Sequence, residues 1–159
     1  MIRLIFLTLF LQIFLNADEL KIKAQSFYAD EKEGISIFEG TVNVIKGHDE
    51  LNASKVTVYI DEKKSPTKFI AEGDVSFKVK TEDNATYEGV AQKAVYLPNK
   101  KEYNFYKDVH LKQLSEKKEI KGDEVVLKTL ENKAYAKGAE EKPVIMIFDI
   151  KEEKQEEQK

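Results

Sequence analysis

The residues that could carry out chemistry are few and far apart. The chain has two histidines, His48 within His48-Asp49-Glu50 and His110, and it has no cysteine. Three consecutive residues of a turn cannot all converge on one ion, and His110 is the only other histidine, so the spacing does not predict a metal site. The sequence also lacks a Gly-x-Ser-x-Gly motif and a glycine-rich phosphate loop. We therefore expect a protein that is not an enzyme and needs no cofactor.

Two short segments match a glycosylation signal. Asn52 in residues 50–54 and Asn84 in residues 82–86 each begin an Asn-x-Ser/Thr triplet with an acidic residue two places upstream. The simpler interpretation, which we favour, is that both are asparagine-containing turns of a repeated sequence. The sequence leaves modification of either residue open.

Charged residues indicate which partners to expect. The formal net charge of −3 argues against a nucleic-acid partner, which requires a basic face. Several lysines beside predicted strands could contact anionic headgroups, although an ordinary solvated face is the simpler interpretation. These lysines are Lys78, Lys80, Lys107, Lys112 and Lys121.

The two ends of the chain differ in composition from its middle. Residues 1–17 have one basic residue, Arg3, an apolar run and then Ala17 before an acidic pair, which is the pattern of a signal peptide cleaved after Ala17. An uncleaved membrane anchor is the alternative. Residues 151–159 contain no apolar residue and are predicted to be a disordered charged tail. The middle, residues 18–150, is predicted to be a single domain.

The elements that must position these residues are repeated strands. The segment that begins FEGTVNVI at Phe38 returns as AEGDVSFKV at Ala71, again as YKDVHLKQL at Tyr106, and begins once more at Gly138. Apolar residues occupy every second position, as in Val75, Phe77 and Val79, which is typical of half-buried antiparallel strands. Polar turns separate the runs. We therefore expect an all-β fold whose strands are about 5–8 residues long.

Strands with one apolar face can fold over to enclose an apolar interior. Side chains of the protein or a ligand could fill that interior, and the sequence does not distinguish the two. The alternation slips by one residue in 53–56 and in 122–125, as it would at a β-bulge, so the predicted inward face is uncertain beyond those points.

The segment from Tyr87 to Gly138 resembles the OstA-like family of periplasmic lipopolysaccharide-transport proteins, the LptA-like proteins. The matching pieces are Glu88-Gly89 followed by Ala91, the strand end Tyr96-Leu97, and then YKDVHLKQ, IKGDEV and AYAKG. Upstream, FEGTVNVIKG and LNASKVTVYI are similar to the first repeat of the family. One departure is Lys107-Asp108 where the family has a glycine, a change that we expect to alter a turn and not a site.

The resemblance implies a twisted, partly open antiparallel β-jelly roll built from repeated strand units, with the acyl chains of lipopolysaccharide in an apolar groove. It further implies head-to-tail assembly with further copies, with an LptC-like inner-membrane partner and with an LptD-like outer-membrane partner. Such a bridge would carry lipopolysaccharide through the periplasm to the outer membrane.

Two sets of residues are predicted to serve these roles. The groove lining consists of the central members of the alternating faces: Val42, Val44, Val58, Phe77, Tyr96, Phe105 and Leu111. The assembly edges are the terminal strand-forming segments, with Leu20 and Ile22 at the start and Val144, Met146 and Phe148 at the end.

Two other functions fit the same sequence. With an uncleaved N-terminal segment, the chain would be an LptC-like, membrane-anchored sister protein. With a self-filled interior, it would be an exported structural scaffold without a ligand.

Overall fold

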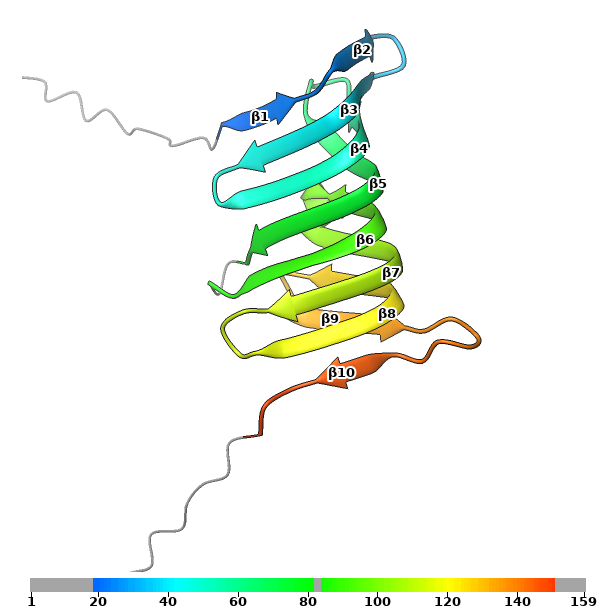
Figure 1. Cartoon of the computed structure of the whole chain (residues 1–159). Coiled ribbons are helices and arrows are strands. Elements are labelled where there is room, and N and C mark those ends of the chain that lie inside the picture. The colour runs from blue at the N-terminus through cyan, green and yellow to red at the C-terminus, as the bar shows by residue number, and fades with distance from the viewer. Residues whose placement is uncertain (1–18, 82–83, 151–159) are drawn as a thin grey trace, which may run out of the picture.

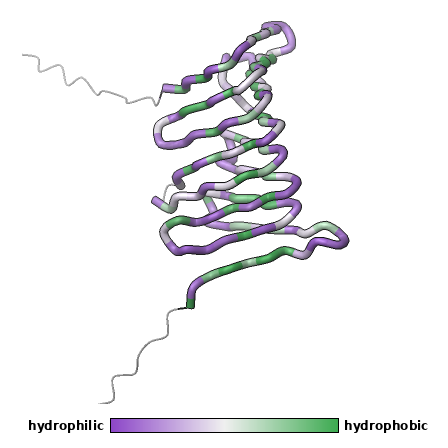
Figure 2. The backbone as a smooth tube through the Cα atoms, in the orientation of Figure 1, coloured by the Kyte–Doolittle hydropathy of each residue, from purple (hydrophilic) through white to green (hydrophobic). Residues whose placement is uncertain are grey.

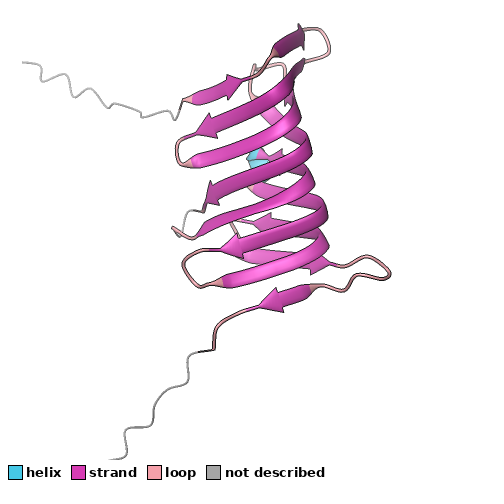
Figure 3. Ribbon diagram, viewed as in Figure 1, coloured by secondary structure: helices cyan, strands magenta, loops and turns pink. Residues whose placement is uncertain are grey.

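The computed structural model describes residues 19–81 and 84–150, which form a single antiparallel sheet (Figures 1 and 3). One short 3₁₀ helix, η1, is the only helix in this described part. The expected fold class, an open antiparallel all-β roll, is confirmed. The elements are β1 (Leu20–Lys23), β2 (Ser26–Asp30), β3 (Ile35–Lys46), β4 (Asp49–Ile60), β5 (Pro66–Lys80), β6 (Thr86–Leu97), η1 (Pro98–Lys100), β7 (Glu102–Gln113), β8 (Lys118–Lys128), β9 (Lys133–Lys137) and β10 (Ile145–Ile147).

The central strands are longer than expected, at 11–15 residues each, so the predicted length of 5–8 residues is wrong for β3–β8. Their pairing register shifts near the middle of each strand, as it does between Glu39 and Val42 of β3. Similar shifts occur in each neighbouring pair from β4 with β5 through to β7 with β8. A bulge bends a strand without ending it, so each of these long strands turns a corner and continues to pair, and the predicted polar turns are the connections between strands.

The row of bulges divides the sheet into two halves that face one another (Figure 1). The front half contains residues 42–46, 49–53, 75–80, 86–91, 109–113 and 118–122. The back half contains residues 35–39, 55–60, 66–72, 93–97, 102–106 and 124–128.

The repeated glycines lie at these corners because the backbone there is left-handed. Gly40 and Gly73 have φ of 81° and 80°, which glycine adopts without steric cost. The third repeat has Lys107 and Asp108 at the same place, with φ of 62° and 50°. The expectation that this departure alters a turn is therefore wrong, because both residues lie inside β7 at its bulge.

The core lies between the two halves. Buried residues from both halves form one cluster, which includes Val42 and Leu111 from the front and Val56, Phe105 and Val125 from the back. Figure 2 shows hydrophobic and hydrophilic residues alternating along the long strands, as a sheet with one buried face requires.

Each end of the sheet is closed by an edge made of two short strands. At the N-terminal end, β1 pairs with the front half of β3 and β2 with its back half. At the C-terminal end, β10 pairs with the front half of β8 and β9 with its back half. The loop between β9 and β10 projects from the sheet (Figure 1). The two terminal segments therefore lie at opposite ends of the sheet.

Candidate functional site

A row of inward-facing apolar side chains crosses the front half from one edge of the sheet to the other. Strand pairing places its members side by side, because each is the register partner of the next. In order from β1 to β10 the row is Ile22, Val44, Leu51, Phe77, Gly89, Leu111, Ile120 and Met146. Glycine is the only member without an apolar side chain, so the interior has a continuous apolar wall.

A row of aromatic residues lies on the back half. Phe69, Tyr96 and Tyr103 are neighbours in register on β5, β6 and β7. The ring centroids of Tyr96 and Tyr103 are 4.4 Å apart, and those of Phe69 and Tyr96 are 6.0 Å apart. Tyr96 and Tyr103 are stacked, whereas the ring of Phe69 is tilted against that of Tyr96.

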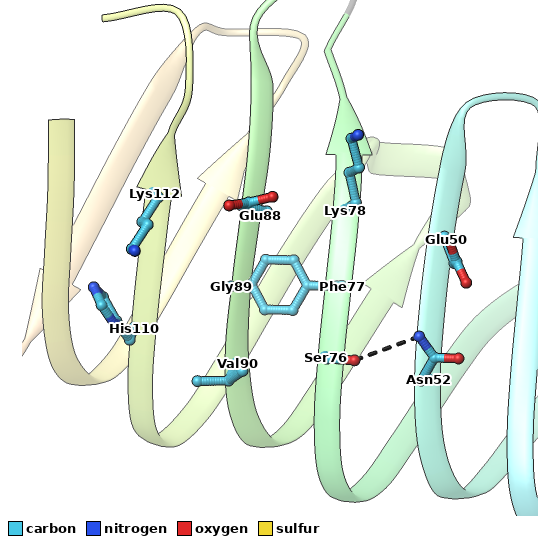
Figure 4. A pocket seen from close by; sticks show the side chains of 10 residues that line it. All are labelled: Glu50, Asn52, Ser76, Phe77, Lys78, Glu88, Gly89, Val90, His110 and Lys112. Atoms are coloured by element: carbon cyan, nitrogen blue, oxygen red, sulfur yellow. Dashed lines mark hydrogen bonds between the residues drawn. The ribbon is translucent and has the colours of Figure 1, made fainter. Parts of the chain in front are cut away.

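One aromatic pair spans the interior. The rings of Phe77, from the front half, and Phe105, from the back half, are stacked with centroids 3.9 Å apart. Gly89 makes room for this contact, since a Cβ atom there would lie 2.9 Å from Cζ of Phe77 and would also clash with the backbone oxygen of His110. Figure 4 shows the Phe77 ring beside the strand at Gly89.

Two cavities lie between the halves, and they share no lining residue. The N-terminal cavity has a volume of about 310 Å³ and is lined by residues that include Leu20, Leu51, Phe69, Phe77 and Phe105. The C-terminal cavity has a volume of about 340 Å³ and is lined by residues that include Leu111, Ile120 and Met146. The apolar interior therefore contains two separate cavities.

A short polar chain crosses the N-terminal cavity. The Tyr103 hydroxyl donates to Oδ2 of Asp49 at 3.4 Å, and the backbone N–H of Lys80 donates to Oδ1 of Asp49 at 2.8 Å. Burial, with the Asp49 charge adding to it, raises the pKa of Tyr103 far above its usual range, so this hydroxyl stays protonated.

The outer face of the sheet is polar and charged. Glu50, Lys78, Glu88, Lys112 and Glu119 are successive register partners across the front half, so their charges alternate in sign. Figure 4 shows four of them around a shallow hollow of about 370 Å³. Exposed pairs of this kind contribute little to stability.

This arrangement changes the interpretation of the flanking lysines. Lys78 and Lys112 belong to the outer charge row, and Lys121 pairs in register with His110 on the same outer face. Lys107 lies exposed at the corner of β7. Of the five lysines, only Lys80, at the end of β5, lies near the opening between the halves.

The two candidate glycosylation sites lie in different surroundings. Asn52 is inside β4 and not in a turn, so that part of the simpler interpretation is wrong. Its amide accepts a hydrogen bond from Asn43 at 2.9 Å and donates one to Ser76 at 3.4 Å. Asn84 is exposed in the connection between β5 and β6, and residues 82 and 83 of its triplet context lie outside the described residues.

All seven residues predicted to line the groove face the interior. Val42, Val58, Phe77, Phe105 and Leu111 are buried in the core cluster. Val44 and Tyr96 are half-buried and line the N-terminal cavity. The prediction missed Leu51, Phe69, Tyr103 and Ile120, which also line the cavities. Tyr103 is two residues before Phe105 on the same strand, so the alternation of inward-facing residues could have identified it. Leu51 is the register partner of Phe77 on the neighbouring strand.

The predicted assembly residues lie at the two ends of the sheet. Leu20 and Ile22 belong to β1, and Met146 belongs to β10. Val144 and Phe148 flank β10, and Phe148 is 54% exposed. Most of the exposed large apolar side chains of the described residues lie in these terminal segments. They are Leu20, Phe27, Tyr28, Tyr135, Ile145, Met146, Ile147, Phe148 and Ile150.

Nowhere in residues 19–81 and 84–150 is there a helix long and apolar enough to cross a membrane. A comparison with curated proteins finds no significant match. Among solved structures, the chain is similar to LptH of Pseudomonas aeruginosa, described as the LptA-homologous periplasmic component of the conserved lipopolysaccharide transport device. The identity is 17% and the TM-score 0.73, with 84% of this chain and 96% of that chain covered, so the two share a fold.

A family model for the LPS transport proteins described as LptA/(LptD N-terminal domain) matches residues 21–133, which is well over half of the sequence. This family consists of transport components and not of enzymes. With its single open antiparallel sheet and apolar interior, the chain belongs to the LptA/LptD N-terminal domain family of lipopolysaccharide transport proteins.

Proposed function

We propose that this protein binds lipopolysaccharide in the periplasm and holds its acyl chains between the two halves of the sheet. The observation that carries the proposal is the row of apolar side chains, broken only at Gly89, that runs from Ile22 on one edge to Met146 on the other. Each methylene moved from water into such a lining gains about 0.8 kcal/mol. A protein of net negative charge gains little from a phosphorylated headgroup, so binding depends mainly on the acyl chains.

Copies of the chain assemble head to tail through the two edges. Along the chain, β1 in the front half is followed by β2 in the back half, whereas β9 in the back half is followed by β10 in the front half. The two edges therefore have opposite strand directions, because their neighbours β3 and β8 do. A second copy placed in line would therefore continue the antiparallel sheet, with its β1 beside β10. A contact between unlike edges does not close on itself and gives strings of variable length.

The same edges join the protein to related folds in membrane partners. By analogy with the family, the N-terminal edge contacts an LptC-like inner-membrane protein and the C-terminal edge an LptD-like outer-membrane protein. Exposed apolar side chains at both edges support this role, since an isolated edge strand of this kind is an aggregation hazard.

Residues 1–17 act as a signal peptide that is cleaved after Ala17, which places the mature protein in the periplasm. These residues lie outside the described part of the structure. N-terminal sequencing of the exported form tests the proposal, because an intact Met1 would identify a membrane-anchored, LptC-like protein instead.

Lipid binding is tested by native mass spectrometry of protein purified from cells that make lipopolysaccharide. We expect the wild type to retain lipopolysaccharide and Leu51→Asp, which introduces a charge into the N-terminal cavity, to lose it. Val90→Asp is the matched control, because Val90 is 49% exposed and belongs to the outer hollow. A wild-type protein without lipid would indicate a structural scaffold, and equal retention by both variants would refute the proposed lining.

Assembly is tested by sedimentation velocity across a concentration series. Removal of residues 144–159 deletes β10 and everything after it, so we expect a folded protein that stays monomeric where the full chain forms strings. Long oligomers of the truncated chain would show that this edge is not the joint.

A further inference from the structure

The edge strands of the back half, β2 and β9, carry exposed aromatic side chains. Phe27 and Tyr28 lie on β2, Tyr135 lies on β9, and all three are exposed. Within the described residues, β2 pairs only with β3 and β9 pairs only with β8. The two strands lie at opposite ends of the sheet (Figure 1). Each therefore presents an edge with which a strand of another copy can pair.

The two edges match each other in strand direction and in hydrogen-bond pattern. The strands β2 to β9 are an even number of consecutive antiparallel strands, so β2 of a second copy placed in line would lie antiparallel to β9. Each residue directs its N–H and C=O groups to one side, so hydrogen-bonded and non-hydrogen-bonded pairs alternate from one strand pair to the next along a row of register partners. When a row crosses an even number of strands, its first and last residues are therefore ready for the same kind of pair.

The rows of register partners determine which residues would meet. One row begins at Phe27 and ends at Ala136, and its neighbour begins at Tyr28 and ends at Tyr135. Continuing these rows into a second copy gives pairs of a β2 residue and a β9 residue, which are Ser26 with Lys137, Phe27 with Ala136, Tyr28 with Tyr135, and Asp30 with Lys133.

The paired side chains are complementary in size and in aromatic character. On the inner face, the ring of Phe27 would lie beside Ala136, whose small side chain leaves room for it. On the other face, Tyr28 and Tyr135 would form a cross-strand aromatic pair, which stabilises neighbouring strands. The contact would also cover three rings that are exposed in the single chain.

The remaining pair is complementary in charge. Asp30 and Lys133 would lie directly opposite each other, and opposite charges at such positions stabilise a strand pair. Asp30 accepts the backbone N–H groups of Lys32 and Glu33 through Oδ1, and a carboxylate can accept further hydrogen bonds. Lys133 contacts Glu131 at 2.7 Å, and its ammonium group has three protons to donate. Both groups can therefore keep their present contacts in the joint.

We infer that β2 of one copy pairs with β9 of the next in this register, and that the Tyr28–Tyr135 and Asp30–Lys133 pairs determine which edges recognise each other. This inference rests on the proposed function, since it concerns the head-to-tail assembly and adds the register and the residues of its back half. With β1 beside β10, it completes a joint that extends across both halves of the sheet.

Engineered cysteines test the register, because the chain has no cysteine of its own. The matched variant carries Ser26→Cys and Lys137→Cys, whose Cβ atoms would be about 4.5–5.5 Å apart across the joint. The mismatched control carries Ser26→Cys and Lys133→Cys, which would be displaced along the strand by roughly 13 Å. All three positions are exposed, so both variants should fold. Because β2 and β9 lie at opposite ends of one sheet, a crosslink between them joins two copies.

Each purified exported protein is treated with dibromobimane, a short reagent that joins two thiols, and is separated on a denaturing gel. We expect a ladder of crosslinked copies from the matched variant, at least about fivefold less product from the mismatched one, and monomers from each single-cysteine variant. Equal ladders from both double variants would overturn the inference, as would dimers from a single-cysteine variant, which would show that like edges meet. If the matched variant sediments as strings without crosslinking, the inference fails and head-to-tail assembly stands. If it neither sediments as strings nor crosslinks, both fail.

A charge reversal tests the same joint without cysteines. Lys133→Glu places a like charge opposite Asp30, so the strings should dissociate at about a two- to tenfold higher protein concentration in sedimentation velocity. Adding Asp30→Asn, which keeps an acceptor for the turn, should recover part of the loss. Lys100→Glu is the matched control, because it makes the same change in net charge at the end of η1, away from both edges. Equal weakening by Lys100→Glu, or a loss that Asp30→Asn does not reduce, would overturn the role of the charge pair.

Discussion

The aromatic pair Phe77–Phe105 is the contact that most directly joins the front and back halves of the sheet. Phe77 is 5% exposed and Phe105 is 1% exposed, and their rings are stacked at 3.9 Å. Phe77→Ala removes a ring that lines the N-terminal cavity and leaves its place empty. Replacing a buried phenylalanine by alanine costs about 3–5 kcal/mol, and the lost stacking places the cost toward the upper end of that range. For a domain of this size the midpoint of thermal unfolding should fall by about 6–20 °C.

Thermal and urea unfolding followed by far-ultraviolet circular dichroism measure this cost. Phe27→Ala is the matched control, because Phe27 also contacts an aromatic ring, that of Phe38 at 4.9 Å, but is 62% exposed on the edge strand β2. We expect the control to lose less than about 1 kcal/mol. If Phe77→Ala were no more destabilising than Phe27→Ala, the two halves would not depend on this pair, and the described interior would be wrong.

Three further predictions concern single positions. Gly89→Ala should destabilise the fold by about 1–3 kcal/mol or more, because the added methyl group clashes with Phe77 and with the backbone of His110. Gly122→Ala should cost less, because the nearest atom to its added methyl group is 3.0 Å away. Urea unfolding of the two variants measures the difference. Lys107→Gly should be neutral or stabilise the fold by up to about 1 kcal/mol, because glycine adopts the left-handed conformation at φ of 62° without steric cost. Lys112→Gly, within the same strand, should destabilise the fold. A destabilised Lys107→Gly protein would contradict the assignment of residue 107 to a left-handed corner. The hydrogen bond from His110 lowers the pKa of Glu119, so the ionised carboxylate stabilises the fold at pH values above its unfolded-state pKa and loses that effect as the pH falls through the lowered pKa. Glu119→Gln should therefore reduce the free energy of unfolding at neutral pH and have no effect in stronger acid. A difference in stability that does not change with pH would contradict this prediction.

The apolar alternation was sufficient to predict the fold class and the inward-facing residues. Val75, Phe77 and Val79 alternate in sequence and are all buried, as a strand with one buried face requires. Prediction failed where the backbone changes direction. Gly40 and Gly73 lie at corners within strands, which the alternation alone did not indicate, because a left-handed residue fits a bulge as well as a turn. No local sequence pattern indicates whether a bulge or a turn forms there, since that depends on whether the neighbouring strand continues to pair beyond the left-handed residue.

The site was predictable only in part, for the same reason. The sequence indicated an apolar lining but not the contact between Asp49 and Tyr103, which are 54 positions apart and meet only because the sheet folds over along its row of bulges. The flanking lysines were equally ambiguous, because their side of the sheet depends on the same bulges. Lys78 and Lys112 proved to be on the outer face, in register with glutamates.

Site-specific photo-crosslinking tests the central claim that the acyl chains of lipopolysaccharide lie between the two halves of the sheet. A photoreactive amino acid is placed at Leu51 and Ile120, which face the interior, and at their neighbours Asn52 and Lys121, which face outward. In cells that make lipopolysaccharide, we predict lipid adducts from the two interior positions and none from the two outer ones. Equal labelling of neighbouring positions, or labelling of Asn52 and Lys121 alone, would contradict the account.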